Sequence, residues 1–213
     1  MGWQLLMVYR LSSVPYRGGY VFMKLTLGLL AASIVFTMAP TSAQSMANPA
    51  ATMGAQREAM VPLAYMDGVW RGTGWTILSN GEKRTVTQTE RVGSFLGGSV
   101  KVIEGRGYDA DGNVAFNAFG TIAYAPATKQ YTLHSYAMGS VGDFAMQTTP
   151  DGYTWEIPAG PATIRYTVVI KDGTWKEVGD SIVPGKPPTR FFEMTLQRIG
   201  NTDWPAAGAI PAK

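Results

Sequence analysis

Four charged side chains occupy positions where period-two patterning turns them toward the inside of a β-rich domain: Glu90, Glu104, Arg106 and Glu177. Alternate residues of a strand share a face, so each charge takes the face of its apolar neighbours. The apolar residues that set this phase are Val86, Val92, Val100, Val102 and Trp175. Buried charges are costly unless they are paired, hydrogen-bonded or hydrated. The pattern therefore predicts either a salt-bridged network or a water-filled pocket with a ligand.

Aromatic residues on the same predicted faces suggest what such a ligand would touch. We expect it to lie against Trp75, Trp155, Tyr166 and Trp175, with its polar end near Arg106 and the carboxylates. Small residues at inward positions of two strands leave room for it: Ala118, Gly120, Ser135 and Ala137. An apolar wall with a few polar groups is typical of small-molecule sites.

Catalysis and metal binding are the alternative chemistries. A buried carboxylate with a raised pKa can act as a general base, and Glu104 or Glu90 would take that role in a cofactor-free isomerase or hydrolase. A nucleophile triad would need His134, the sole histidine, which we expect to face solvent, as we do Glu193. An oxygen-only metal site of Glu90, Glu104 and Glu177 has no supporting ligand spacing, so we expect no metal.

Ten strands account for most of the chain after residue 67. They are predicted at Gly68–Leu78, Arg84–Leu96, Ser99–Tyr108, Val114–Tyr124, Gln130–Gly139, Gly142–Thr148, Tyr153–Pro158, Thr163–Lys171, Thr174–Ile182 and Arg190–Ile199. The links carry Gly or Asn where hairpins need positive φ, as in Lys171-Asp172-Gly173. Short strands in an up-and-down order without a long intervening helix predict an all-β antiparallel barrel.

Short motifs at both ends of the strand region resemble those of the calycin barrels, the superfamily of lipocalins and fatty-acid-binding proteins. Gly68 and Trp70 form a Gly-x-Trp step in the first strand, and Arg198 lies in the last. The resemblance implies a structural role, with the Trp70 ring closing one end of the barrel and Arg198 packed over it in a cation–π or stacking contact. Leu96-Gly97-Gly98, Val102 to Gly105 and Asn117 to Tyr124 resemble an uncharacterised group of exported bacterial calycin-like domains.

Haem-binding barrels of the nitrobindin kind belong to the same superfamily and need a proximal histidine. His134 lies in the fifth predicted strand, whereas that family places its ligand near the C-terminal strands. We therefore expect no cofactor.

The N-terminal region has the anatomy of a secretory signal peptide that starts at Met23. A positive start, an apolar run over Leu25 to Phe36 and a small-residue stretch ending at Ala43 place it at residues 23–43. Residues 1–22 are then a long n-region or an upstream mis-start, 44–64 a flexible linker, 65–200 the barrel and 201–213 a mobile tail. A short helical turn or lid is possible over Arg57 to Met66, and Trp204 could dock on the barrel.

Composition narrows the classes of partner. The chain has 18 Lys and Arg, 15 Asp and Glu, and no cysteine. Cleavage after Ala43 would remove Arg10, Arg17 and Lys24 and leave 15 charges of each sign. That balance, without a basic run, argues against nucleic acid as a partner. The apolar run of the signal is too short for a transmembrane span, and the absence of cysteine excludes disulfides and thiolate sites.

The sequence thus predicts a periplasmic or secreted barrel that binds a small, partly apolar molecule and does no chemistry on it. The catalytic alternative stays open, as does a third one, a cell-envelope interaction protein with a solid barrel. The size of an interior cavity separates this third alternative from the other two.

Overall fold

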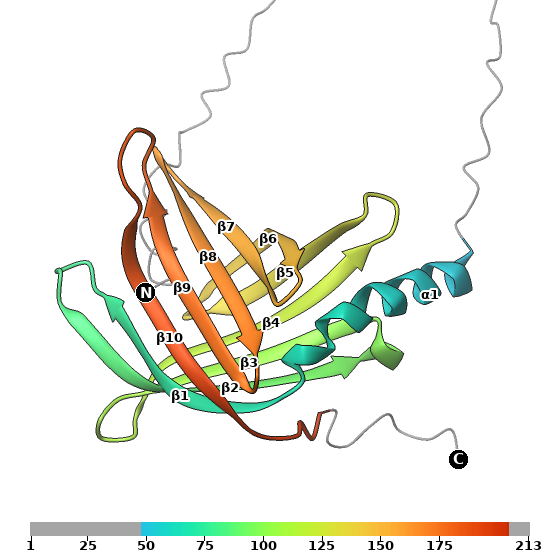
Figure 1. Cartoon of the computed structure of the whole chain (residues 1–213), viewed down its shortest axis with the longest axis horizontal. Helices are drawn as coiled ribbons and strands as arrows, with labels where there is room; N and C mark the ends of the chain where they lie inside the picture. The colour runs from blue at the N-terminus through green and yellow to red at the C-terminus, as the bar shows by residue number, and fades with distance from the viewer. Residues whose placement is uncertain (1–47, 205–213) are drawn as a thin grey trace, which may run out of the picture.

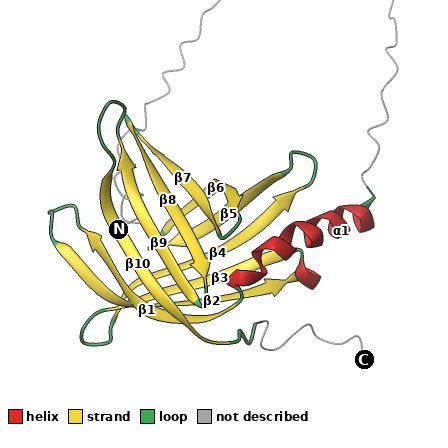
Figure 2. Ribbon diagram, in the orientation of Figure 1, coloured by secondary structure: helices red, strands yellow, loops and turns green. Residues whose placement is uncertain are grey.

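The computed structural model describes residues 48–204, which form a closed, ten-stranded antiparallel barrel with one α-helix before it (Figures 1 and 2). The strands are β1 (Gly68–Ile77), β2 (Lys83–Phe95), β3 (Val100–Tyr108), β4 (Val114–Ala125), β5 (Gln130–Ala137), β6 (Ser140–Thr149), β7 (Gly152–Ala159), β8 (Ala162–Lys171), β9 (Thr174–Ile182) and β10 (Thr189–Gly200). Each strand pairs with its neighbours in sequence, and β1 pairs with β10 to close the barrel. The predicted fold class is confirmed.

Hairpin turns follow the predicted chemistry. Asp172 and Gly173 both have positive φ, 51° and 70°, in the turn between β8 and β9, as a type I′ hairpin requires. Between β3 and β4, the Asp109 carboxylate accepts hydrogen bonds from the backbone N–H groups of Asp111 and Asn113, at 3.0 and 2.9 Å. These local contacts set the turns and hence the register of the strands they join.

A helix precedes the barrel in the segment for which the sequence predicts a flexible linker. α1 (Pro49–Met60) starts after Asn48, whose side chain caps it by accepting from the N–H of Ala50 at 3.1 Å. Pro49 suits the first helical turn, and the following residues are mostly good helix formers. The linker prediction is therefore wrong for residues 49–64, because capping and helix propensity outweigh the small, polar composition, whereas the helical turn expected over Arg57 to Met66 is present.

One end of the barrel is covered by α1 and the short helix η2 (Val61–Met66), and is named here the closed end. Tyr131 of β5 donates a hydrogen bond from its hydroxyl to the carbonyl of Ala59 at 2.6 Å. Tyr65 likewise donates to the carbonyl of Gly152 at 2.9 Å. These bonds attach both helices to strands that lie far from them in sequence.

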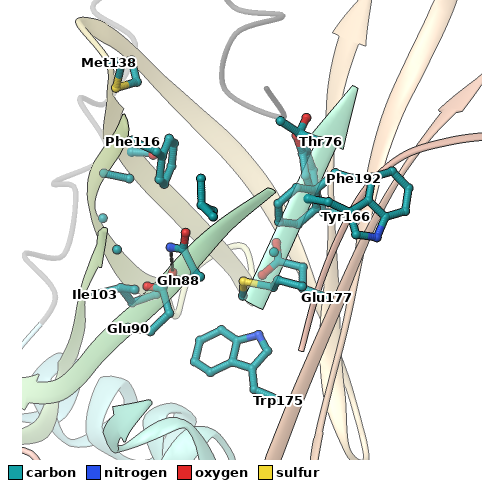
Figure 3. A pocket seen from close by; sticks show the side chains of 18 of the residues that line it. Thr76, Gln88, Glu90, Ile103, Phe116, Met138, Tyr166, Trp175, Glu177 and Phe192 are labelled. Carbon is teal, nitrogen blue, oxygen red and sulfur yellow. Dashed lines mark hydrogen bonds between the residues drawn. The ribbon is translucent and has the colours of Figure 1, made fainter. Parts of the chain in front are cut away.

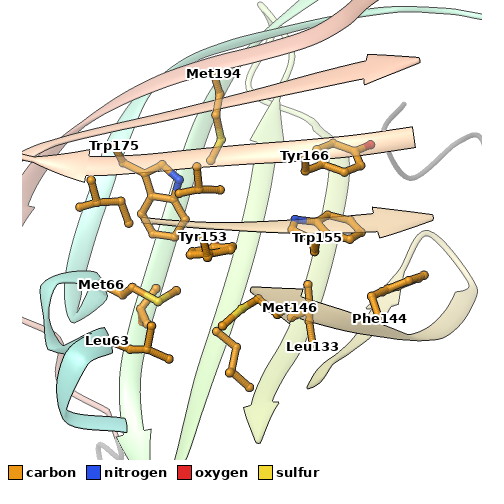
Figure 4. Close-up of a cluster of buried hydrophobic side chains, with 14 of the residues drawn as sticks. Leu63, Met66, Leu133, Phe144, Met146, Tyr153, Trp155, Tyr166, Trp175 and Met194 are labelled. Carbon is orange, nitrogen blue, oxygen red and sulfur yellow. The ribbon is translucent and has the colours of Figure 1, made fainter. Parts of the chain in front are cut away.

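The closed end is densely packed with apolar side chains (Figure 4). Leu63 and Met66 of η2 are fully buried. Trp70 donates from its indole nitrogen to the Met66 carbonyl at 3.0 Å and makes an edge-to-face contact with Trp175, with ring centroids 5.6 Å apart. Trp70 therefore closes this end, as the calycin resemblance implies.

Arg198 does not contact Trp70 in the expected way. It lies opposite Trp70 in the pairing of β1 with β10, next to a bulge at Val69/Trp70. Its exposed side chain donates to the Asp67 carbonyl at 3.3 Å and to Asn201 Oδ1 at 2.8 Å. Within residues 48–204 the cation–π contacts involve other pairs. The expected contact between ring and guanidinium is therefore corrected to a backbone tie across the barrel end.

A buried ion pair also lies at the closed end. Lys101 of β3 is only 2% exposed, and its ammonium contacts the Asp67 carboxylate at 2.6 Å and the Ser94 hydroxyl at 2.9 Å. Asp67 lies between η2 and β1, so the pair joins this junction to β3. The contacts of Lys101 satisfy a charge that would otherwise be costly to bury.

The chain after β10 packs on the outside of the barrel. Trp204 makes ring contacts with Phe95 and Phe119, with centroids 6.0 and 6.4 Å apart. A Cβ at Gly93 would lie 2.9 Å from the Trp204 Cβ, so this glycine gives the tail its close approach. The expected docking of Trp204 is confirmed.

The described residues contain no helix long and apolar enough to span a bilayer. The predicted signal peptide at 23–43 and the residues before it lie outside the described part of the chain, as do residues 205–213 of the predicted tail.

Candidate ligand-binding cavity

A cavity of about 120 Å³ occupies the half of the barrel away from η2 (Figure 3). It extends from Trp175, near the closed end, to Thr76, Phe116 and Met138 at the opposite end. Arg84 and Met138, both exposed, lie at this opposite end, which we name the mouth. A barrel with a cavity is the arrangement that the small-molecule prediction requires.

Small side chains create this space. Ala118, Gly120 and Ser135 line the cavity on β4 and β5, as predicted from their inward phase. Larger residues at these positions would fill the barrel, as Ile122 and Leu133 do nearer the closed end. The fourth small residue, Ala137, is buried but is not among the lining residues.

Glu90 of β2 lines the cavity wall and is 8% exposed. Its Oε1 accepts a hydrogen bond from Gln88 Nε2 at 2.8 Å. A Cβ at Gly105 of β3 would lie only 2.7 Å from that oxygen, so the absence of a side chain there makes room for the carboxylate. Burial raises the pKa of Glu90 well above its ordinary value, and nearby Glu177 raises it further. Burial therefore favours protonation of Glu90 relative to an exposed glutamate.

Glu177 of β9 faces the same cavity and is partly accessible through it. Burial raises its pKa to about 7, although the indole N–H groups of Trp175 and Trp155 oppose that shift. Both carboxyl groups thus lie in one cavity and both bind a proton more tightly than an exposed glutamate. Glu177 is the group whose charge changes near neutral pH.

Aromatic rings form the wall beside Glu177. Trp155 and Tyr166 are stacked, with centroids 4.2 Å apart and planes 8° apart. Phe192 packs edge-on against Tyr166 at 5.8 Å. A Cβ at Gly179 would approach the Tyr166 ring to 3.0 Å, so this glycine seats the ring. The wall is flat, apolar and rigid, which suits a planar ligand.

Unpartnered polar atoms cluster around the cavity. Within the described chain, the buried side-chain nitrogen and oxygen atoms without a hydrogen-bond partner are Thr76 Oγ1, Ser135 Oγ, Tyr166 Oη and Trp175 Nε1. All of these residues line the cavity. Buried polar groups are normally satisfied, and these four atoms are exceptions that lie close behind the cavity wall without being accessible from it.

Five of the eight predicted ligand-contact residues face the cavity: Glu90, Trp155, Tyr166, Trp175 and Glu177. Trp75 borders it as well, but its side chain has a different environment from that predicted. It lies five residues after the inward Trp70, so the alternation of β1 places its side chain on the outer face, with Lys83 Nζ 4.2 Å from its ring centroid.

Glu104 and Arg106 are corrections, because both face outward. Arg106 Nε donates to Glu104 Oε1 at 3.0 Å, and half of the Arg106 side chain is exposed. The predicted phase of β3 relied on the valines of that strand. Val102 is buried on the outside, since it pairs with Gly93, the glycine that Trp204 covers. The alternation of β3 is as predicted, but the face that carries Val102 packs against the chain after β10 and not into the barrel.

His134 and Glu193 are confirmed as outward. His134 Nδ1 lies 2.6 Å from Asp143 Oδ1 on the barrel exterior, and Glu193 contacts Arg190 at 3.5 Å. No cluster suited to a metal ion is found within residues 48–204. Sequence reasoning missed several lining residues, among them Thr76, Phe116 and Met138. Gly105 and Gly107 are a further signal for the inward Glu90 and Gln88, since alternate glycines leave room for the large side chains opposite them.

Comparisons with known proteins support the fold. No protein-family model and no curated protein sequence matches the chain. The crystal structure of Rv2717c from M. tuberculosis matches with a TM-score of 0.50 at 13% identity, covering 68% of this chain and 97% of that one. The S-type phycobiliprotein lyase CpeS from Guillardia theta matches with a TM-score of 0.46 at 11% identity, covering 70% and 98%. The first of these matches supports the barrel fold described above.

Proposed function

We propose that this protein is an exported, non-catalytic barrel that binds a small, partly apolar molecule in its cavity. The observation that carries the proposal is the cavity itself, lined by the stacked rings of Trp155 and Tyr166 and by the carboxyl groups of Glu90 and Glu177. Carboxyl groups are costly to bury unless they are paired, hydrogen-bonded or hydrated. A bound molecule with a polar end would supply a partner for Glu177, whose side chain is only partly buried.

The shape of the cavity supports a binding role over a solid-barrel interaction protein. Its walls offer stacked rings at Trp155 and Tyr166, and small residues keep the interior free. A volume of about 120 Å³ suits a molecule of one or two rings. Placement in the periplasm or outside the cell rests on the predicted signal peptide at 23–43 alone.

Binding of indole would test this role. Calorimetric titration of the full chain with indole is expected to give saturable binding to a single site. Ala118→Leu, which fills the cavity, is expected to weaken binding by about tenfold or more. Ala145→Leu makes the same change at an exposed position outside and should leave binding unaltered. Absence of saturable binding, with native mass spectrometry showing only the bare chain, would refute the proposal.

General-base catalysis by Glu177 is the second candidate, favoured by its pKa of about 7. A base whose pKa lies near the working pH is well suited to proton transfer. Discrimination requires a molecule that co-purifies with the protein. If it is chemically altered by the protein and Glu177→Gln stops that turnover while binding persists, the catalytic function replaces the binding one.

A further inference from the structure

We infer that the ligand is a small organic cation, a protonated amine on an aromatic or other planar apolar body, held by Glu177 and the surrounding rings. This inference rests on the proposed function, since it names the chemical class of molecule that the cavity takes. It follows from the signs of the charged groups that face the cavity and from how far each of them lies from the mouth.

The charged groups lining the cavity are unequal in sign and position. Glu90 and Glu177 lie inside, on β2 and β9, whereas Arg84 is exposed at the mouth. Lys101 is paired with Asp67 at the closed end and is not a lining residue. An anionic ligand lodged between the carboxyl groups would therefore find no cation at that depth. A fatty acid or another carboxylate is disfavoured by this arrangement.

A cation gains two interactions in the same place. Its N–H groups can donate to the Glu177 carboxylate, forming a charge-assisted hydrogen bond of the stronger kind. Its charge can also lie near the faces of Trp155, Tyr166 or Trp175, the rings around that carboxylate. Glutamate beside electron-rich rings is the combination that recognises ammonium groups, and a neutral polar molecule would use only part of it.

Ligand charge couples to the ionisation of Glu177. The titratable groups that face it are Glu90 of β2, Tyr153 of β7 and Tyr166 of β8, and Arg84 lines the same cavity at the mouth. Burial raises the pKa of both tyrosines well above the ordinary value, so they stay neutral. Glu177, with its pKa of about 7, is the group that gains charge as the pH passes neutrality. The affinity for an amine should therefore increase as Glu177 ionises.

The test compares benzylamine, benzyl alcohol and benzoate, which share a ring and differ in charge. Calorimetry at about pH 8, where Glu177 is ionised, should show that benzylamine binds at least about tenfold more tightly than benzyl alcohol and that benzoate binds most weakly. Glu177→Gln should reduce the affinity for benzylamine to that for benzyl alcohol and leave the affinity for benzyl alcohol unchanged. Glu193→Gln, the same change on the outer face of β10, should alter neither.

A second measurement keeps the inference falsifiable if the Glu177 variant does not fold. In the unaltered protein, benzylamine affinity should rise by about tenfold from about pH 6 to about pH 8, while benzyl alcohol affinity stays constant. Equal binding of the amine and the alcohol, or preference for benzoate, would overturn the amine inference and leave the binding function standing. If neither indole nor any of these three probes binds, both proposals fail.

Discussion

The closed end and the cavity half of this barrel are built by the same strands yet are packed in opposite ways. At the closed end, Leu63, Met66 and Leu196 are completely buried, and η2 lies over the strands. In the cavity half, Ala118, Gly120 and Ser135 stand where large residues would be needed to fill the space. Period-two alternation makes a barrel in both halves. Side-chain volume then decides whether the interior is a core or a cavity.

The two halves also differ in how they treat polar groups. At the closed end the Trp70 indole donates to a carbonyl and Lys101 contacts both Asp67 and Ser94. In the cavity half, Thr76, Ser135 and Tyr166 each hold a buried polar atom without a partner. Trp175 lies at the boundary, packed on Trp70, while its indole N–H lies near Glu177 without reaching hydrogen-bond geometry. We therefore expect stability to be concentrated at one end and the proposed ligand binding at the other.

Loss of Trp70 should cause the largest effect. Trp70→Ala removes a fully buried ring that packs on Trp175, and should lower the free energy of unfolding by about 3–5 kcal/mol. Phe116→Ala, at the mouth, should cost about 1 kcal/mol, because that ring borders open space. Urea denaturation of both variants measures the difference. Similar losses would show that the two halves contribute equally to stability.

Removing one or the other partner of the ion pair at the closed end should lower stability by different amounts. Asp67→Ala leaves the Lys101 ammonium buried without its counter-ion, and should cost about 3 kcal/mol. Lys101→Met leaves Asp67, whose side chain is 32% exposed, and should cost less, about 1 kcal/mol. The double variant should be more stable than Asp67→Ala alone. Thermal and urea unfolding of the three variants would measure this, and a double variant no better than Asp67→Ala would contradict it.

Glu177 should make the cavity half less stable as pH rises. Its pKa moves from 4.5 to about 7 on folding, so the folded state loses stability as the pH rises through that window. Glu177→Gln should therefore be more stable than the unaltered protein by about 3 kcal/mol at about pH 8, with the difference vanishing near pH 4.5. Urea titrations across this range provide the measurement. Glu193→Gln, already exposed, should show no such pH-dependent gain.

The fold could be predicted from sequence because its signals are local. Alternation and turn residues such as Asp172-Gly173 act over a few positions, so all ten strands were found, with ends shifted by at most two residues. Assigning residues to the cavity relied on the same alternation. It succeeded in β2, where one face is clearly polar and Glu90 shares the other face with valines. It was also correct for Glu177, which shares its face with Trp175.

Prediction failed where a distant segment supplies the contact. β3 is apolar on its outer face because Trp204, about a hundred residues later, covers that side of the barrel at Gly93. No property of β3 alone reports this, so Glu104 and Arg106 were placed inside. Trp75 was different, since its odd spacing from Trp70 in β1 already indicated the outer face. The fold was thus more predictable than the site, because orientation depends on what each face meets.

Closure of the barrel by β1 and β10 has a consequence for how the chain folds. Every other pair of neighbouring strands is consecutive in sequence, so those hairpins can form locally. The closing pair instead joins Gly68–Ile77 to Thr189–Gly200 across the whole domain, and such long-range contacts form late and slowly. Until then the growing sheet has free edges that can pair with other chains. A nascent chain is therefore most prone to aggregation just before its last strand joins the first.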